Sequence, residues 1–424
     1  MYPAARIENA EIPRRIEATD CGTLMPESSL PEGLSMLDHD RIRRDTPGAS
    51  GRVFLDSAGS SLPPTVVVDT AIAHLRREAE IGGYRAASER LDDLAAVKTS
   101  IGTLIGAPAS TIALSDSATR AWTDFFYSVP LSAGDRILLC EAEYASNAIS
   151  ALHRAEVSGA TVEVIPSDAS GCIDVDALEQ MLDDRVRVVS VVHAPTNGGL
   201  INPARAVADL AHRHGALVLL DACQSIGQLR VDVDELGVDA LSATGRKWLR
   251  GPRGTGFLYL RPELAASLHP PALDLHSAQW EDSSTYRMAD DATRFEFWEC
   301  DVAARLALGA AVGYLLELGI DDVADAISER AEYLRAGMRR IPGVTVHDLG
   351  DRKSGIVSFT MDGEEPVAVR DRLADRNVTV TVSHRGSTRL DMTGRGLDAV
   401  VRASPHYFVT FAELDTMLAA LTGV

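Results

Sequence analysis

Lys247 is the residue of this sequence whose type and setting point most directly to chemistry. It lies in the stretch DALSATGRKWLRGPRGTGFLYLR (239–261), after a short strand-like run and directly before a loop rich in glycine and proline. Thr244 and Arg246, both of types that bind phosphate, stand beside it. This setting indicates a Schiff-base lysine, although Lys247 alone would more often be an exposed surface charge. The residues upstream favour the interpretation of Lys247 as a Schiff-base lysine.

Two upstream segments supply groups that such a site needs. Asp221 closes the apolar run ALVLLD, and Gln224 follows it in DACQS. The segment DSATRAW opens a predicted helix at about Ala118, where free backbone amides and the Thr119 hydroxyl attract phosphate. Each feature alone also fits ordinary helix capping by Asp, Ser or Thr. In combination with Lys247 they indicate a site for a phosphate-bearing cofactor.

Together these residues resemble the signature of the class V, fold-type I enzymes that use pyridoxal 5′-phosphate (PLP). That family includes cysteine desulfurases, isopenicillin N epimerase-like proteins and cysteine-conjugate C–S lyases, and the resemblance spans about Phe54 to Leu418. It implies PLP as the cofactor, no metal, and an amino acid as the small-molecule substrate. The cofactor contacts that it implies are attachment at Lys247, a proton held on the ring nitrogen by Asp221, a contact of Gln224 to the phenolic oxygen, and phosphate contacts from Ala118, Thr119, Thr244 and Arg246.

The resemblance also places residues that would face the substrate. Tyr144, in EAEYASN, stands where the family stacks an aromatic ring on the cofactor, and its phenol could also transfer a proton. Arg402, in VRASPHYF, resembles the arginine that pairs with the substrate α-carboxylate. In HAPTNGGLINP, either Thr196 or Asn197 is expected to contact the substrate, and Asn197 is favoured.

Two departures separate this sequence from cysteine desulfurases, which carry sulfur on a mobile cysteine of the small domain. No cysteine follows Cys300, and the corresponding stretch SHRGSTRLDMTGRG offers Ser, Thr and Arg instead. The segment RFEFWECD holds Trp298 and Glu299 where desulfurases have a Gly-Thr-Pro turn, as in the epimerase-like and C–S-lyase-like branch.

These departures favour a PLP-dependent C–S β-lyase that cleaves a cysteine S-conjugate to a thiol, pyruvate and ammonia. Such lyases act in ergothioneine or lincosamide-type antibiotic assembly, so the resemblance implies a place in sulfur-containing natural-product metabolism. A decarboxylating oxidative deaminase, an aminotransferase and an epimerase remain alternatives on the same cofactor. A catalytically inactive binding protein is the alternative from another class.

Strand-like runs alternate with amphipathic helical patterns from Val53 to about Leu264. The expected strands are 136–140, 161–165, 186–192, 216–221 and 256–260, and the expected helices lie near 119–128, 147–157, 174–182 and 203–214. Nearly continuous apolar strands in this alternation predict an α/β fold whose mostly parallel sheet is covered on both faces. The resemblance implies a sheet of the seven-stranded type. Because ligands bind beyond the carboxyl ends of such strands, Asp221 is expected on the ligand side.

The chain is expected to divide into an N-terminal arm (1–50), a large PLP-binding domain (51–300) and a smaller C-terminal α+β domain (301–424). A long apolar helix is predicted at 302–318. After it come shorter predicted strands and helices, at 344–349, 355–361, 366–376, 378–383 and from Phe411.

The formal charge of −20, from 41 basic and 61 acidic residues, argues against nucleic acid and anionic lipid as partners. No apolar run reaches ~18 residues, so no membrane-spanning helix is expected. The N-terminus lacks the apolar core of a secretion signal, and the five scattered cysteines show no metal-ligand spacing. A cytoplasmic protein is therefore expected.

The resemblance implies a homodimer, because fold-type I enzymes build each active site at a two-fold interface. Gly82, Gly83 and Tyr84, with the RFEFWE segment, are the portions expected to approach the partner's cofactor. Trp298 is the expected interface anchor, and an ordinary buried core position is the alternative for it.

Overall fold

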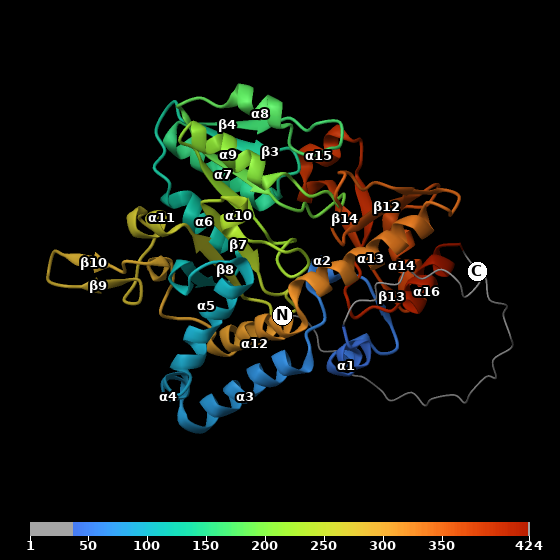
Figure 1. The fold of residues 1–424 in the computed structure, drawn as a ribbon, viewed down its shortest axis with the longest axis horizontal. Coiled ribbons are helices and arrows are strands. Elements are labelled where there is room, and N and C mark those ends of the chain that lie inside the picture. The colour runs from blue at the N-terminus through green and yellow to red at the C-terminus, as the bar shows by residue number, and fades with distance from the viewer. Residues whose placement is uncertain (1–36, 423–424) are drawn as a thin grey trace, which may run out of the picture. The chain divides into compact units, whose positions relative to one another are not determined.

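A seven-stranded sheet forms the centre of the larger part of this computed structural model (Figure 1). Its strand order is β2-β8-β7-β6-β5-β3-β4; the five strands from β7 to β4 run parallel, and β8 is antiparallel to both of its neighbours. The strands are β2 (Ile112–Ser115), β3 (Arg136–Cys140), β4 (Thr161–Ile165), β5 (Val186–Val192), β6 (Leu217–Asp221), β7 (Ala240–Thr244) and β8 (Gly256–Leu260). The predicted α/β fold with a mostly parallel seven-stranded sheet is confirmed.

Alternate side chains of each strand point to opposite faces of this sheet, and each face has its own buried apolar cluster. On β3, Leu138 belongs to one cluster, whereas Ile137 and Leu139 belong to the other. Helices α6 (Ala118–Ser128) and α7 (Ala145–Ser158) add side chains to the cluster of Ile137, and helices α8 (Val175–Met181) and α9 (Ala204–Arg213) add theirs to the cluster of Leu138. All four helices lie within two residues of their predicted bounds.

A four-stranded antiparallel sheet with the order β11-β12-β15-β14 forms the C-terminal part. Its strands are β11 (Val344–Val346), β12 (Val357–Met361), β14 (Thr381–His384) and β15 (Ala399–Ala403). The longer helices of the C-terminal region are α12 (Val302–Leu318), α13 (Ile320–Met338), α14 (Pro366–Ala374) and α16 (Phe411–Thr422). The predicted domain boundary at residue 300 stays a prediction. Helix α12, which follows this boundary, packs against two helices from the first part of the chain, α3 (Thr65–Ile81) and α5 (Leu91–Ile105) (Figure 1).

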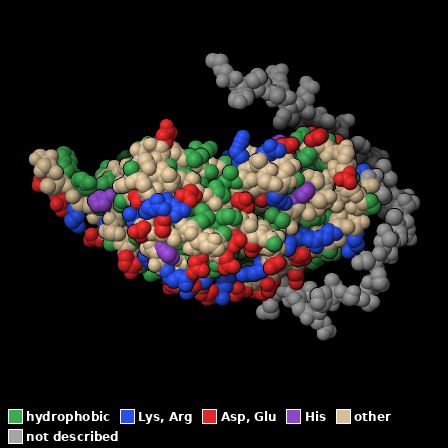
Figure 2. All heavy atoms as spheres, turned by 90° about the horizontal axis from the view of Figure 1, so that it is seen from above, with side chains coloured by type: hydrophobic (Ala, Val, Ile, Leu, Met, Phe, Trp, Pro, Cys, Tyr) green, Lys and Arg blue, Asp and Glu red, His purple; other side chains and the backbone are tan. Residues whose placement is uncertain are grey.

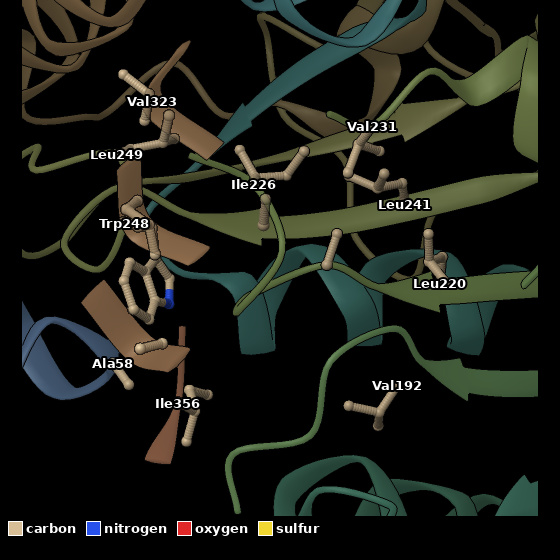
Figure 3. Close-up of a cluster of buried hydrophobic side chains, with 14 of the residues drawn as sticks. Ala58, Val192, Leu220, Ile226, Val231, Leu241, Trp248, Leu249, Val323 and Ile356 are labelled. Atoms are coloured by element: carbon tan, nitrogen blue, oxygen red, sulfur yellow. The ribbon is translucent and has the colours of Figure 1, made fainter. Parts of the chain in front are cut away.

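The first described strand crosses over to the C-terminal part. Strand β1 (Val53–Phe54) pairs in parallel with β13 (Val378–Thr379), and Asp56 forms a bridge with Ser404. Figure 3 shows the result in the core, where Ala58, Trp248 and Ile356 from distant parts of the sequence lie together. This crossover places Asp56 beside Arg402, which no local sequence pattern indicated.

The structure describes residues 37–422, so residues 1–36 of the predicted N-terminal arm lie outside it. The described end of that arm contains helix α1 (His39–Asp45). The remaining shorter elements are α2 (Ser57–Ser60), α4 (Gly83–Ser88), α10 (Val233–Leu236), α11 (Pro262–Ser267), α15 (Arg389–Gly394) and the hairpin of β9 (Ala278–Trp280) with β10 (Tyr286–Met288).

Within residues 37–422, no single helix is long and apolar enough to cross a membrane. The helices α12 and α13 reach the required length and apolar composition only when they are taken together, and the angle between them is 84°. On the face displayed in Figure 2, acidic and basic side chains are mixed and lie most densely along the lower edge.

Candidate functional site

One cavity gathers the predicted cofactor residues at the carboxyl ends of the parallel strands. The last residues of β5, β6 and β7 (Val192, Asp221 and Thr244) all line it, as the topology of a parallel sheet requires. All the residues predicted to contact the cofactor are among its walls, namely Ala118, Thr119, Tyr144, Asp221, Gln224, Thr244, Arg246 and Lys247. The chain thus brings together residues that lie up to 129 positions apart, from Ala118 to Lys247.

Lys247 lies in the loop that follows β7, and it lines the cavity. Burial lowers the pKa of this lysine, and Arg246 and Arg402 lower it further. Asp221 and the Cys223 thiol act in the opposite direction. A lowered pKa increases the fraction of neutral amine, which is the form of lysine that attacks a carbonyl carbon.

The end of the cavity that is predicted to bind phosphate is built from the start of helix α6 and two strand ends. Ser117 caps the helix by accepting a hydrogen bond from the Arg120 amide at 3.1 Å, and the first-turn residues Ala118 and Thr119 line the cavity. A Cβ atom at Gly256 would lie 2.9 Å from the Ala118 nitrogen, so only glycine lets β8 approach the helix start this closely. Free amides at a helix start and the helix dipole favour an anion here.

Thr244 and Arg246 complete this end of the cavity from β7 and the loop after it. The Thr244 hydroxyl donates to the Thr255 carbonyl at 3.3 Å, and the Arg246 guanidinium donates to the Gly59 carbonyl. The Gly59 contact leaves further N–H groups of Arg246 for an anion, because a guanidinium carries five donors.

Asp221 lines the same cavity from the end of β6, where two hydrogen bonds hold its carboxylate. Its side chain is buried, with Oδ2 accepting from the Asn147 amide at 2.9 Å and Oδ1 accepting from the Cys223 backbone at 2.9 Å. A carboxylate fixed in this way at a strand end can hold a proton on a heterocyclic nitrogen.

The Gln224 amide is engaged by the protein on both sides. Its nitrogen donates to the Ala58 carbonyl at 3.1 Å and to the Thr196 hydroxyl at 3.3 Å, and its oxygen accepts from the Trp248 indole at 2.9 Å. The expected contact of Gln224 with the phenolic oxygen therefore stays a prediction. It requires the amide to exchange one of these partners.

Tyr144 ends the loop before α7, lines the cavity and exposes 37% of its surface. Its backbone amide donates to Glu143 Oε1 at 2.8 Å, which fixes the loop while the ring stays accessible. The predicted stacking and proton-transfer roles of Tyr144 stay predictions.

The predicted carboxylate-binding residue, Arg402, lies on β15 directly behind Thr196. It donates to the Thr196 hydroxyl at 2.7 Å and pairs with Asp56 at 3.2 Å. Its Nε atom is buried and has no hydrogen-bond partner among the described residues. Burial lowers the pKa of Arg402 and raises that of Asp56. An unpartnered N–H on a buried guanidinium fits the binding of a further carboxylate.

The structure separates the two candidate substrate residues of the loop after β5. Thr196 lines the cavity, whereas the Asn197 amide points away and contacts Thr388 at 3.0 Å and Met392 at 3.2 Å. The substrate contact of Asn197, favoured from the sequence, stays a prediction that this side-chain orientation does not support.

Sequence reasoning missed several residues of the site. Glu143 and Asn147 connect to Asp221 and are almost completely buried, Asp56 pairs with Arg402, and Cys223 lines the cavity next to Lys247. The motif EAEYASN carried a signal for two of them, because Glu143 and Asn147 are four residues apart and share one face of the helix start.

Residues 53–417 match the family model described as aminotransferase class-V. The chain belongs to this family. Pyridoxal 5′-phosphate is the cofactor of class-V enzymes, so membership confirms the cofactor predicted from the sequence. The site fits it: β8 approaches the start of α6 closely at Gly256, which leaves a helix start that favours an anion, and Lys247 and Asp221 line the same cavity.

Relatives of this class-V chain include a cysteine desulfurase of Synechococcus elongatus, which is 28% identical over 407 residues that cover 91% of the chain. The chain spans 64% of that relative's length. Among solved structures, an apo cysteine desulfurase from Thermococcus onnurineus gives a TM-score of 0.84 at 23% identity, covering 92% of this chain and 98% of that one. The cystine C–S lyase C-DES in complex with cysteine persulfide gives 0.81 at 24%, covering 89% and 99%. These structures confirm the fold.

Proposed function

We propose that this class-V chain is a C–S β-lyase that cleaves a cysteine S-conjugate, with water, to a thiol, pyruvate and ammonia. One observation supports the proposal above the others. Lys247 lines the cavity and Arg402 donates a hydrogen bond to the wall residue Thr196, whereas no cysteine follows Cys300, and the segment 383–396 contains Ser, Thr and Arg but no Cys. Without a sulfur-accepting cysteine in that segment, the sulfur leaves the site on its own substituent.

Cys223, the thiol that lines the cavity, does not replace the missing cysteine. Burial and the neighbouring Asp221 carboxylate raise the pKa of Cys223 well above its ordinary value. A thiol that stays protonated is a poor nucleophile towards sulfur. We therefore expect Cys223→Ala to retain the lyase reaction.

The residues divide the work as follows. When bound, PLP supplies an electron sink for the bond that breaks at Cα. Lys247 would hold the cofactor and serve as the base for the Cα proton, and its lowered pKa keeps more of the amine neutral and able to accept that proton. Asp221 holds a proton at the ring nitrogen. Ala118, Thr119, Thr244 and Arg246 bind the phosphate.

Substrate orientation falls to Arg402 and Thr196. The guanidinium binds the α-carboxylate, while the 2.7 Å bond to Thr196 and the pair with Asp56 fix its plane. Tyr144, exposed at the cavity, donates a proton to the departing sulfur. The setting in natural-product assembly rests on the sequence resemblance alone, since the relatives named above are cysteine desulfurases and a cystine C–S lyase.

We also propose that the chain acts as a homodimer. Tyr84 exposes 78% and Trp298 exposes 51% of its surface in the single chain, so Trp298 is not a buried core residue. Large exposed aromatic side chains are enriched where a second subunit packs.

The product assay tests the reaction. The PLP-loaded enzyme is incubated with S-ethyl-cysteine, and pyruvate and ethanethiol are measured with and without added 2-oxo acid. Equal amounts of pyruvate and thiol, independent of the oxo acid, are expected, with Lys247→Ala inactive. Amino transfer that requires the oxo acid, or release of carbon dioxide from the substrate, would replace this proposal with one of the other class-V outcomes.

A further inference from the structure

A buried polar network lies behind Asp221, on the side away from the cavity. Glu143 Oε2 accepts from the Ser190 hydroxyl at 2.8 Å, and Glu143 Oε1 accepts from the Asn147 amide at 2.9 Å. The same Asn147 nitrogen donates to Asp221 Oδ2 at 2.9 Å. One amide therefore joins two carboxyl groups, and all four side chains of the network are at most 5% exposed.

Burying the Glu143 carboxyl in this network costs free energy. A buried carboxyl without a cation is disfavoured in its charged form, and among the described residues no Lys or Arg is a main cause of the pKa shift of Glu143. The titratable groups that face it are Asp221 from β6 and the Cys140 thiol from β3, while β5 and α7 contribute the neutral Ser190 and Asn147. Burial raises the pKa of Glu143 to about 7, and the charge of Asp221 also raises it.

We propose that Glu143, acting through Asn147, is a positioning residue that fixes Asp221 and strengthens its negative potential towards the cofactor's ring nitrogen. The role rests on the proposed function, because it requires Asp221 to face that nitrogen. The Asn147 amide has two N–H groups and spends both on carboxyl oxygens, so it fixes the Asp221 plane. An ionised Glu143 adds a second negative charge behind Asp221 and favours a protonated ring.

The ionisation of Glu143 is linked to the binding of PLP, so the affinity for PLP depends on pH. A cationic ring beside Asp221 favours the ionised form of Glu143, so cofactor binding releases a proton from Glu143 at pH values near and below 7. Glu143 therefore increases the affinity for PLP as the pH rises. This increase disappears in acid, where Glu143 is protonated both with and without bound PLP.

The test measures the PLP dissociation constant and the visible absorption of the bound cofactor from pH 5 to 8.5. Glu143→Gln keeps the volume and the acceptor oxygen for Asn147 but cannot ionise. We expect the variant to bind PLP about tenfold more weakly than the wild type at pH 8, with the two converging near pH 5; tenfold corresponds to about one pKa unit of coupling. Asn147→Ala breaks the bridge but leaves the charge of Glu143 in place, so it should weaken PLP binding across the whole pH range by loosening Asp221.

Asp124→Asn is the matched control. Burial raises the pKa of Asp124 to about 6, but its hydrogen-bond partner is Arg120 and it does not contact Asp221. This variant should keep the wild-type ratio of affinities across the pH range.

Glu143→Gln or Asn147→Ala binding PLP as the wild type does at every pH would overturn the inference. Should Glu143→Gln fail to fold, as shown by circular dichroism, the Asn147→Ala comparison decides alone. Asp221→Asn separates this inference from the proposed function. If Asp221→Asn weakens PLP binding and changes the absorption while the other two variants do not, only the role of Glu143 is wrong. If Asp221→Asn also changes nothing, the proposed role of Asp221 is wrong.

Discussion

Gly256→Ala should damage the phosphate end of the site through packing alone. Gly256 begins β8 and pairs with Thr244 on one side and Ser115 on the other. A methyl group there would lie 2.6 Å from the Ala243 carbonyl oxygen and 2.9 Å from the Ala118 nitrogen. Both are backbone atoms and cannot rotate away, so the start of α6 must move by several tenths of an ångström.

The magnitude follows from two costs. Overpacking of this kind destabilises proteins by about 1–3 kcal/mol, and the loss of glycine's unfolded-state freedom returns roughly 0.4–1 kcal/mol. Misplacing one charge-assisted hydrogen bond between the helix start and the phosphate costs about 1.5–3 kcal/mol. Since about 1.4 kcal/mol changes a dissociation constant tenfold, PLP should bind at least ~10 times more weakly.

The assay compares thermal unfolding and the PLP dissociation constant of Gly256→Ala with those of Gly313→Ala. Gly313 lies within α12, where a Cβ atom meets nothing within 4 Å. Its substitution should stabilise the fold by about 0.5–1 kcal/mol and leave PLP affinity unchanged. A Gly256→Ala protein that is as stable as the wild type and binds PLP equally well would refute the packing argument.

Four further outcomes are expected. Asp221→Asn should cost roughly 3–5 kcal/mol in the reaction barrier, the usual cost of removing one partner of a buried charge pair, and a normal kcat would contradict its role. Arg402→Ala should raise KM for the amino acid strongly and spare PLP retention, whereas an unchanged KM would remove it from the site. In the cofactor-free protein, the free energy of unfolding should fall as pH rises from 4.5 to about 7, because the folded state holds the Glu143 proton over that range; Glu143→Gln should reduce the fall. Sedimentation should show a dimer at low micromolar concentration, and Trp298→Ala should weaken it; an active wild-type monomer would contradict the dimer.

Local patterns in the sequence predicted the elements that carry the cofactor residues. The apolar runs that end at Cys140, Val192 and Asp221 have the strand bounds that the structure shows to within one residue, because buried parallel strands read as nearly continuous apolar stretches. The lysine loop and the start of α6 could be predicted from the sequence because phosphate sites require particular residue types at fixed positions. This part of the site follows from local sequence.

The rest of the site depends on long-range packing that no local pattern encodes. Asp56 reaches Arg402 only because β1 pairs with β13, more than 300 residues further along the chain. Whether Thr196 or Asn197 lines the cavity depends on the conformation of the loop after β5. A shift of one residue along this loop would exchange their places. The link from Glu143 to Asp221 likewise required α7 and the strands β3 and β6, which lie on either side of β5, to be in place.

The central claim is that this cavity holds PLP on Lys247, and the composition of the chain makes it directly testable. Lys98, Lys247 and Lys353 are the three lysines of the sequence. Lys98 pairs with Glu296 at 3.0 Å and Lys353 bonds to the Gly350 carbonyl, so neither lines the cavity. Borohydride reduction of the PLP-loaded protein, followed by peptide mass mapping, should place the cofactor's mass on the peptide of Lys247. Its appearance on Lys98 or Lys353, or on no peptide, would contradict the account.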